Sequence, residues 1–397
     1  MVRINRIIFN QNRMYKISTL NKISGKGLEL LTDQYELTDN TGEASAILVR
    51  SADMHGMSFS ENLLAVARVG AGVNNIPVDK LTEQGIVVFN TPGANANAVK
   101  ELVIASMIMA ARNIPDAIKW ENSLTAYVAK TIEKGKSQFT GKEIFGKTLG
   151  IIGLGFIGIL VAGAAEALGM RVLGFDPYIS LKEVYDLSNN IQVYDSLTEM
   201  LPDCDYVSIH IPANSETSRM FDYDMVSAMK NNSVLLNFSR DKLIVSEDIN
   251  RSIAEKKLRY YVTDFPTDEI QNSERVILIP HLGASTEEAE ENCATMAVKE
   301  VMDFIENGNI LNSVNFPAVQ AGKWDKGTRV LALHKNIPFM LGSQTSALAS
   351  MGINISNLVN KSKGDYACTL IDFDEVVDED TIRKAFTLDG IFSVRLL

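Results

Sequence analysis

The chain has 397 residues, of which 46% are hydrophobic and 22% charged, and its formal net charge is −11 at pH 7. This length predicts two or three domains, and the composition is ordinary for a globular protein. The excess of acidic residues argues against a nucleic-acid surface, which needs clustered Lys and Arg, and no apolar run approaches the ~18 residues of a membrane span.

The N-terminal quarter alternates short strands with short helices. For residues 1–13 we expect either a lead without regular structure or a start site placed upstream of Met14, and a short presequence is a further alternative. The segments KISTL, SAILVRS, LLAVARVG and GIVVFNTP are strand-like, and GKGLELLTD and VDKLTEQG between them are helix-like. This alternation predicts a parallel sheet covered by helices. After the break NTPGANANAV, a long helix is expected over about 98–112.

A second alternating block begins near Lys147. KTLGIIGLG is an apolar strand that runs into glycines, FIGILVAGAAEALGM is a helix, and RVLGFDP is the next strand. The alternation continues through SIHIP, LLNFSR, YVTDFP and RVILIPHLG, and it predicts a second parallel sheet. One amphipathic helix is expected after Thr286.

The C-terminal segment predicts a third, smaller unit. TRVLALHK is a strand, PFMLGSQTSALASMG a helix, and INISNLVNKSKG with DYACTLIDFD a hairpin. A helix at EDTIRKAFTLDG and a strand at IFSVRLL complete the order βαββαβ, which is that of a ferredoxin-like fold.

The cysteines indicate a reducing compartment. Cys204, Cys293 and Cys368 form no CxxC pair and no metal-ligand spacing. We therefore expect free thiols, a cytoplasmic protein and no metal site.

The segment GLGFIG has the spacing of a dinucleotide-binding loop. It lies between a predicted strand and a predicted helix, and Asp176 ends the following strand. Gly153 permits the tight turn, Gly155 lets the backbone approach a diphosphate, and Gly158 lets helix and strand pack closely. A carboxylate at Asp176 accepts from ribose hydroxyls and repels a 2′-phosphate, so the sequence favours NAD over NADP.

Three later strands end in side chains suited to hydroxy-acid oxidation. LLNFSR brings Arg240, YVTDFPTDE brings Asp264, Asp268 and Glu269, and LIPHLGAST brings His281. Because ligands bind at the carboxyl ends of parallel strands, we expect an Arg, an acid and a His to converge there. The Arg would bind a carboxylate, the His would take the hydroxyl proton, and the acid would orient the His.

The chain resembles the D-isomer-specific 2-hydroxyacid dehydrogenases. The likeness rests on RVGAGVNNI, FNTPGANANAVKE, GKTLGIIGLGFIG, SIHIP, NFSR, DFPTDE and PHLGAST, which occur in the family's order. It implies that Arg240, Glu269 and His281 are catalytic, that Asp176 holds the adenosine ribose, and that Asp264 holds the nicotinamide carboxamide. The acid motif lacks the family's final Pro, so the neighbour Asp268 stays an alternative to Glu269.

The resemblance also implies the remaining binding residues. The expected NAD-binding set is Gly153, Gly155, Phe156, Ile157, Gly158, Asp176, His210, Pro212, Phe238, Ser239, Asp264 and Gly283. The expected substrate-binding set is Arg50, Ser51, Val69, Gly70, Ala71, Asn95 and Lys100, with Arg50 and Ser51 on the side of a substrate phosphate. Lys100 is equally well explained as a solvated lysine.

The same likeness predicts a discontinuous organisation. Residues 1–95 and 283–317 would form the substrate domain around a Rossmann NAD domain at 96–282, with 318–397 as a regulatory or assembly domain. The last segment resembles the ACT domain, a module that binds amino acids.

The ACT likeness places an L-serine effector at three residues, His334, Asn336 and Asn354. Phe339 replaces the usual glycine there and would crowd the effector. An assembly module without a ligand is the alternative.

Within the family, the motifs are most similar to members that oxidise 3-phospho-D-glycerate with NAD. Two alternatives are an NADH-dependent reductase of another 2-oxo acid, such as 2-oxoglutarate, and an NAD-sensing corepressor-like binding protein. The resemblance further implies a homodimer through the nucleotide domain or a homotetramer, and neither a nucleic-acid nor a membrane partner.

Overall fold

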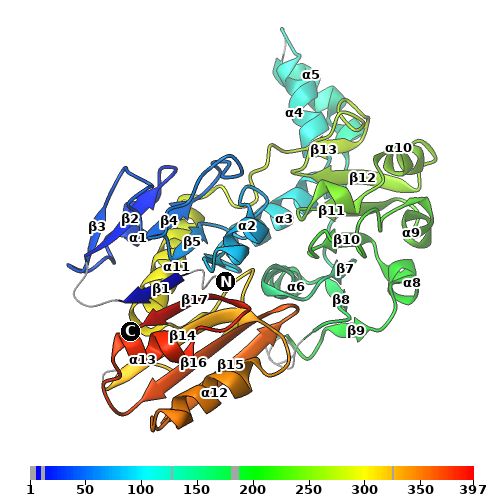
Figure 1. Cartoon of the computed structure of the whole chain (residues 1–397). Coiled ribbons are helices and arrows are strands. Elements are labelled where there is room, and N and C mark those ends of the chain that lie inside the picture. Colours follow the sequence, from blue (N-terminus) through cyan, green and yellow to red (C-terminus); the bar gives the residue numbers. More distant parts are fainter. Residues whose placement is uncertain (1–5, 10–13, 127, 180–186, 324–325) are drawn as a thin grey trace. The chain divides into compact units, whose positions relative to one another are not determined.

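The structure is a computed structural model that describes residues 6–9, 14–126, 128–179, 187–323 and 326–397 (Figure 1). The chain divides into two compact units, Met1–Ala94 with Glu290–Leu397, and Asn95–Ala289. The predicted fold class is confirmed, because two parallel sheets and a C-terminal mixed sheet are present with their helices. The four-segment domain division stays a prediction. None of the helices in the described ranges combines the length and apolar character that crossing a membrane requires.

The unit Asn95–Ala289 is built on a seven-stranded parallel sheet with the order β13-β12-β11-β10-β7-β8-β9. Its strands are β7 (Thr148–Ile152), β8 (Arg171–Phe175), β9 (Gln192–Tyr194), β10 (Tyr206–Ile209), β11 (Ser233–Asn237), β12 (Leu258–Thr263) and β13 (Val276–Leu278). The chain runs outward from β7 to β9 and then returns to β10 on the other side of β7, so the strand order reverses there. In open α/β sheets, ligands bind outside the strand ends at such a reversal.

Helices cover both faces of this sheet, because alternate strand residues enter two separate cores. In β11, Val234 and Leu236 belong to one core and Leu235 to the other. Helices α3 (Ala96–Ala111) and α6 (Phe156–Ala167) contribute to the first core, and α8 (Leu197–Met200), α9 (Tyr223–Ala228) and α10 (Ser246–Ala254) to the second. The other helices among the described residues of the unit are α4 (Ile114–Asn122), α5 (Val128–Gly135), η1 (Lys136–Phe139), η2 (Leu201–Asp203) and η3 (Asp241–Leu243).

The other unit contains a five-stranded parallel sheet with the order β3-β2-β4-β5-β6. Its strands are β2 (Tyr15–Thr19), β3 (Tyr35–Leu37), β4 (Ala46–Val49), β5 (Ala65–Arg68) and β6 (Val87–Phe89), and its short helices are α1 (Gly25–Leu28) and α2 (Val78–Glu83). The long helix α11 (Glu287–Asn307) shares a core with this sheet through residues such as Ala294, Val298 and Val301. The amphipathic helix expected after Thr286 is therefore present, and it packs on the first sheet of the chain.

The C-terminal sheet contains the predicted βαββαβ unit. Its elements are β14 (Thr328–Lys335), α12 (Met340–Ser350), β15 (Asn357–Lys363), β16 (Tyr366–Phe373), α13 (Glu379–Ala385) and β17 (Ile391–Leu396). A buried ion pair joins its two central strands, because the guanidinium of Arg329 donates to both carboxylate oxygens of Asp372 at 2.5 and 2.9 Å. Both side chains are almost fully buried, at 0% and 1% exposure.

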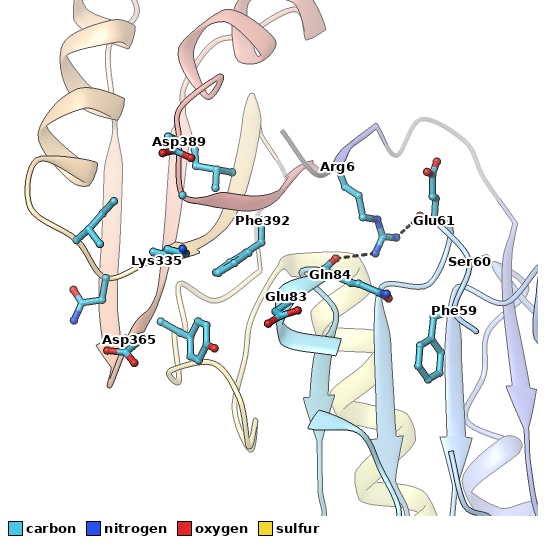
Figure 2. A pocket seen from close by; sticks show the side chains of 15 residues that line it. Arg6, Phe59, Ser60, Glu61, Glu83, Gln84, Lys335, Asp365, Asp389 and Phe392 are labelled. Atoms are coloured by element: carbon cyan, nitrogen blue, oxygen red, sulfur yellow. Dashed lines mark hydrogen bonds between the residues drawn. The ribbon is translucent and has the colours of Figure 1, made fainter. Parts of the chain in front are cut away.

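The N-terminal segment corrects one expectation. Residues 6–9 are not an unstructured lead but form β1 (Arg6–Phe9), which pairs in parallel with the outer strand β17. Ile7 and Ile8 pack against two different cores, as alternate residues of a strand must. Arg6 then fixes the strand to the neighbouring parallel sheet, because its guanidinium donates to the carbonyls of Glu61 and Gln84 at the edge of a cavity of about 980 Å³ (Figure 2).

Candidate active site

The three glycines of the loop after β7 lie in different environments. Gly153 has a φ of 93°, and a Cβ there would lie 2.6 Å from the carbonyl oxygen of His210. At Gly158 a Cβ would lie 1.9 Å from the carbonyl oxygen of Gly153, so a side chain would push α6 away from the loop. Gly155 instead faces open space, with nothing within 4 Å of the place of a Cβ. The open side at Gly155 and the N–H groups at the start of α6 suit a diphosphate.

Asp176 lies directly beside this loop. Its Oδ2 accepts a hydrogen bond from the backbone N–H of Leu154 at 2.8 Å, and its Oδ1 accepts from that of Tyr178 at 2.9 Å. A carboxylate has about four acceptor positions, so both oxygens keep capacity for ribose hydroxyls. A hydrogen bond thus links the glycine loop to the predicted ribose acceptor.

The residues expected on the second wall of the cofactor site follow β10 and β11. His210 contacts the Ser208 hydroxyl through Nε2 at 2.8 Å, and burial lowers its pKa to about 3. The ring is therefore neutral near pH 7, in line with a role other than proton transfer. The Ser239 hydroxyl donates to the carbonyl of Ile209 at 2.8 Å, which ties the two strand ends together. Of the other expected residues, Phe238 is buried, Ile157 is half-buried and Phe156 is exposed, while the Pro212 carbonyl accepts a hydrogen bond from Thr217.

Asp264, at the end of β12, has an unused acceptor. Its Oδ2 accepts from the backbone N–H of Gly283 at 2.9 Å, whereas its buried Oδ1 has no hydrogen-bond partner among the described residues. Burial raises the pKa of Asp264, and the hydrogen bond from the Gly283 N–H and the nearby side chains of His281 and Arg240 oppose this rise. Because buried acceptors are normally satisfied, the orphaned oxygen fits a donor such as a carboxamide N–H. This observation and the open side of the glycine loop fit NAD.

Arg240 and His281 both lie against the ring of Phe265. The guanidinium carbon of Arg240 is 5.7 Å from the ring centroid, and the imidazole centroid is 4.6 Å away. The backbone of Arg240 is held by Asn237, a fully buried side chain that donates to the Arg240 carbonyl at 2.8 Å and to the Tyr261 hydroxyl at 3.2 Å. We did not predict Asn237 or Phe265, although both lie inside the motifs NFSR and DFPTDE.

The acid partner of His281 is not in place. Among the residues that the structure describes, no hydrogen bond or ion pair joins the imidazole to Glu269 or Asp268. Glu269 is exposed, its carbonyl accepts from the Asn250 amide at 2.8 Å, and a hydrogen bond from Thr267 lowers the pKa of its carboxyl group. The structure thus brings together Arg240 and His281 but not the predicted triad.

The expected substrate residues of the first parallel sheet form a separate group. Asn21 shapes the turn after β4, because its Oδ1 accepts from the backbone N–H groups of Arg50, Ser51 and Ala52 at 3.0, 2.9 and 3.1 Å. The Arg50 guanidinium forms an ion pair with Glu290 of α11 at 2.6 Å. Neither Asn21 nor Glu290 was predicted, since a loop asparagine and a helix glutamate carry no motif of their own.

The other expected substrate residues lie in the loop after β5 and at the start of α3. The Val69 carbonyl accepts from the Arg68 guanidinium at 3.0 Å, Gly70 has a φ of 140°, and the Ala71 carbonyl accepts from an asparagine amide. In the unit Asn95–Ala289, Asn95 precedes α3 as its N-cap residue without a capping hydrogen bond from its side chain, and the Lys100 ammonium lies 3.6 Å from a carboxylate of the same helix.

The three expected effector residues differ in burial and in whether their side-chain polar atoms are already hydrogen-bonded. His334 is buried, with Nδ1 at 2.8 Å from the Lys335 carbonyl oxygen and Nε2 at 2.7 Å from the Thr369 hydroxyl. Both ring nitrogens are therefore engaged. Asn336 donates to a backbone carbonyl at 3.0 Å, and Asn354 is exposed. The side chain of Phe339 is 87% exposed, and its φ of 65° is one that glycine adopts more readily.

Comparison with known proteins agrees with this geometry. Residues 104–283 match the family model "D-isomer specific 2-hydroxyacid dehydrogenase, NAD binding domain". A D-3-phosphoglycerate dehydrogenase of Methanocaldococcus jannaschii is 33% identical over 91% of this chain, which spans 66% of that relative, slightly less than two thirds. One of Escherichia coli is 32% identical over 86% of this chain and 83% of its own length.

A solved structure gives the same result. The NAD⁺-bound 3-phosphoglycerate dehydrogenase of Entamoeba histolytica superposes with a TM-score of 0.60 and 25% identity, over 76% of this chain and 98% of its own. The expectation of NAD as cofactor agrees with this structure and with the family model. Both curated relatives named above are D-3-phosphoglycerate dehydrogenases, and the chain belongs to the family of D-isomer specific 2-hydroxyacid dehydrogenases.

Proposed function

We propose that the chain catalyses the NAD-dependent oxidation of 3-phospho-D-glycerate to 3-phosphohydroxypyruvate, which opens phosphorylated L-serine biosynthesis. The observation that carries this proposal is that the side chains of Arg240 and His281 both lie against the ring of Phe265. Both side chains also oppose the rise that burial causes in the pKa of Asp264, the residue whose Oδ1 has no hydrogen-bond partner among the described residues. The printed names of the relatives support the choice of substrate.

In the oxidation of the substrate alcohol, one side chain accepts the proton and another binds the carboxylate. The substrate loses a hydride from carbon and a proton from its hydroxyl group, and NAD, when bound, is the acceptor of the hydride. The proton passes to an imidazole nitrogen of His281, which is exposed and makes no hydrogen bond through its ring to a described residue. The guanidinium of Arg240 binds the substrate carboxylate with two parallel N–H donors.

The remaining residues bind the two ends of NAD and the phosphate end of the substrate. Asp264 accepts from the carboxamide through its unused Oδ1, and Asp176 accepts from the ribose. At the far end of the substrate, Arg50 and Ser51 bind the phosphate, while the backbone N–H of Ala71 binds near the carboxylate. The N–H groups of Val69 and Gly70, which we also expected there, already donate to the carbonyls of Val49 and Arg68 at 2.8 and 2.9 Å. We assign Asn95 and Lys100 to the same substrate.

We assign the acid of the catalytic triad to Glu269, whose side chain is exposed and would have to exchange its hydrogen bond from Thr267 for one to His281. An acid beside the imidazole stabilises its charged form and so raises its pKa. Glu269→Gln should therefore shift the acid limb of the kcat/KM profile, and Asp268→Asn should leave it in place. The opposite pattern would assign the role to Asp268.

The decisive experiment follows NADH formation at alkaline pH with 3-phosphoglycerate, D-glycerate, D-lactate and 2-hydroxyglutarate. We expect 3-phosphoglycerate to give the highest kcat/KM, and His281→Ala to lower kcat by ~10²–10⁴-fold while NADH still binds. A preference for 2-hydroxyglutarate would indicate a reductase of 2-oxo acids. NADH binding without turnover of any of the four would indicate a sensor.

We assign the C-terminal unit to assembly, with a homodimer or homotetramer as the expected state and the cytoplasm as the expected location. L-Serine should inhibit weakly or not at all, because both nitrogens of His334 are already hydrogen-bonded. Calorimetric titration with L-serine beside activity at millimolar serine tests this. Tight binding with strong inhibition, both abolished in Asn336→Ala, would overturn the expectation.

A further inference from the structure

A cavity of about 580 Å³ lies along α11, within the unit that contains the first parallel sheet. Its lining comes from one side of α11, from Gly93 and Ala94 before α3, and from the segment 309–312 after α11. The volume is that of a pocket for a small molecule. None of these residues belongs to the proposed catalytic, cofactor or substrate sets.

Glu300 of α11 is the unusual residue of this cavity. It is only 7% exposed, its Oε1 accepts from the Asn312 amide, and its buried Oε2 has no hydrogen-bond partner among the described residues. Burial raises the pKa of Glu300 to about 7, and the bond from Asn312 opposes this. A buried carboxylate is costly unless it is paired, so the open oxygen calls for a donor that the described residues do not provide.

The surroundings restrict the chemistry of that donor. Lys299 and Asp303 are the other charged residues of the lining, and Asp303 already accepts from two asparagine amides at 2.8 and 2.9 Å. The segments 93–94 and 309–312 contribute no charged group. Met296 and Leu311 add apolar surface, and Leu311 is 50% exposed. The lining therefore has two acids, one rim lysine, four uncharged polar residues and an apolar wall.

We propose that this cavity is a binding site for a small primary amine, whose ammonium group pairs with Oε2 of Glu300 and whose short apolar body lies against Met296 and Leu311. A cation satisfies the open acceptor and neutralises the buried charge in one contact. The site is independent of the proposed dehydrogenase activity, since it shares no residue with it.

The test measures binding of n-butylamine to the full chain by calorimetry, with n-butanol and butyrate as probes of equal chain length. We expect binding of the amine alone, weakened roughly tenfold or more in Glu300→Gln, which keeps the side-chain shape and removes the charge. Lys299→Gln, at the rim of the same helix, is the matched control and should bind at least as well as the unmodified chain. Equal binding of amine and alcohol, or equal binding to both Glu300 forms, would overturn the proposal.

The pH dependence gives a second measurement that needs no variant. Only ionised Glu300 attracts the ammonium group, so affinity should rise several-fold between about pH 6 and about pH 8, around a carboxyl pKa of about 7. In Glu300→Gln the affinity should not change over this range. A flat profile in the unmodified chain, or no binding of butylamine at pH 8, would overturn the assignment even if the variant failed to fold.

Discussion

Replacement of Glu290 by Gln should improve the binding of a phosphorylated substrate. The Arg50 guanidinium that we assign to the phosphate is held by the Glu290 carboxylate at 2.6 Å, and the two side chains are 37% and 43% exposed. A phosphate that binds Arg50 must displace this carboxylate. The variant removes the competitor, and the backbone of Arg50 should keep its position because Asn21 holds it by an independent hydrogen bond.

The size of the effect follows from the exposure of the pair. Ion pairs at such exposure contribute about 0.2–1 kcal/mol, so KM for 3-phosphoglycerate should fall by about 1.4- to 5-fold while kcat stays constant. The gain should shrink as salt is added, because salt screens exposed charges.

The assay measures steady-state rates at low ionic strength. It compares KM for 3-phosphoglycerate with KM for D-glycerate, which lacks the phosphate. Glu291→Gln is the matched control, since the neighbouring carboxylate pairs with Lys26 at 2.5 Å and not with Arg50. An unchanged KM in Glu290→Gln, or the same change for D-glycerate, would refute the idea that Glu290 competes with a phosphate.

Three further predictions concern the glycine loop, the C-terminal sheet and the cofactor. Gly158→Ala should weaken NADH binding and lower stability by about 1–3 kcal/mol, because its Cβ would lie 1.9 Å from a carbonyl oxygen. Gly163→Ala, with open space in the same helix, should leave NADH binding unchanged in fluorescence titration and should raise stability in urea unfolding by about 0.5–1 kcal/mol, because alanine favours a helix more than glycine does. Asp372→Ala should cost about 3–5 kcal/mol in urea unfolding, because it leaves the fully buried Arg329 without its carboxylate, and a loss below about 1 kcal/mol would contradict this. Asp176→Ala should narrow the ratio of kcat/KM for NAD over NADP, whereas equal use of both by the unmodified chain would reject charge repulsion as the basis of selectivity.

Features that depend on local sequence could be predicted. The glycine loop requires a strand, a turn and a helix in immediate succession, and Asp176 ends the next strand, so the residues themselves specify the arrangement. Arg240 and His281 could be placed because both end parallel strands, whose carboxyl ends lie at one edge of the sheet. The C-terminal unit was predictable from the alternation of its elements.

Features that depend on distant partners could not be predicted. The segment RIIF is too short to indicate a strand until β17 is known to have an open edge beside it. Asn21 and Asn237 act through bonds from their side chains to backbone atoms, which no sequence spacing reveals. The missing contact between His281 and an acid depends on side-chain rotamers, which a motif does not specify.

The pairing of β1 with β17 affects how the protein can be made. Arg6 pairs with Ser393 and Phe9 with Leu396, so β1 is synthesised 387 residues before its partner strand (393 − 6 = 387). At synthesis rates of about 5–20 residues per second, β1 waits roughly 20–80 s for that partner. During this time the parallel sheets can already form, whereas the C-terminal mixed sheet still lacks the strand that joins β1 to it. Completion of that mixed sheet therefore requires that translation has passed β17.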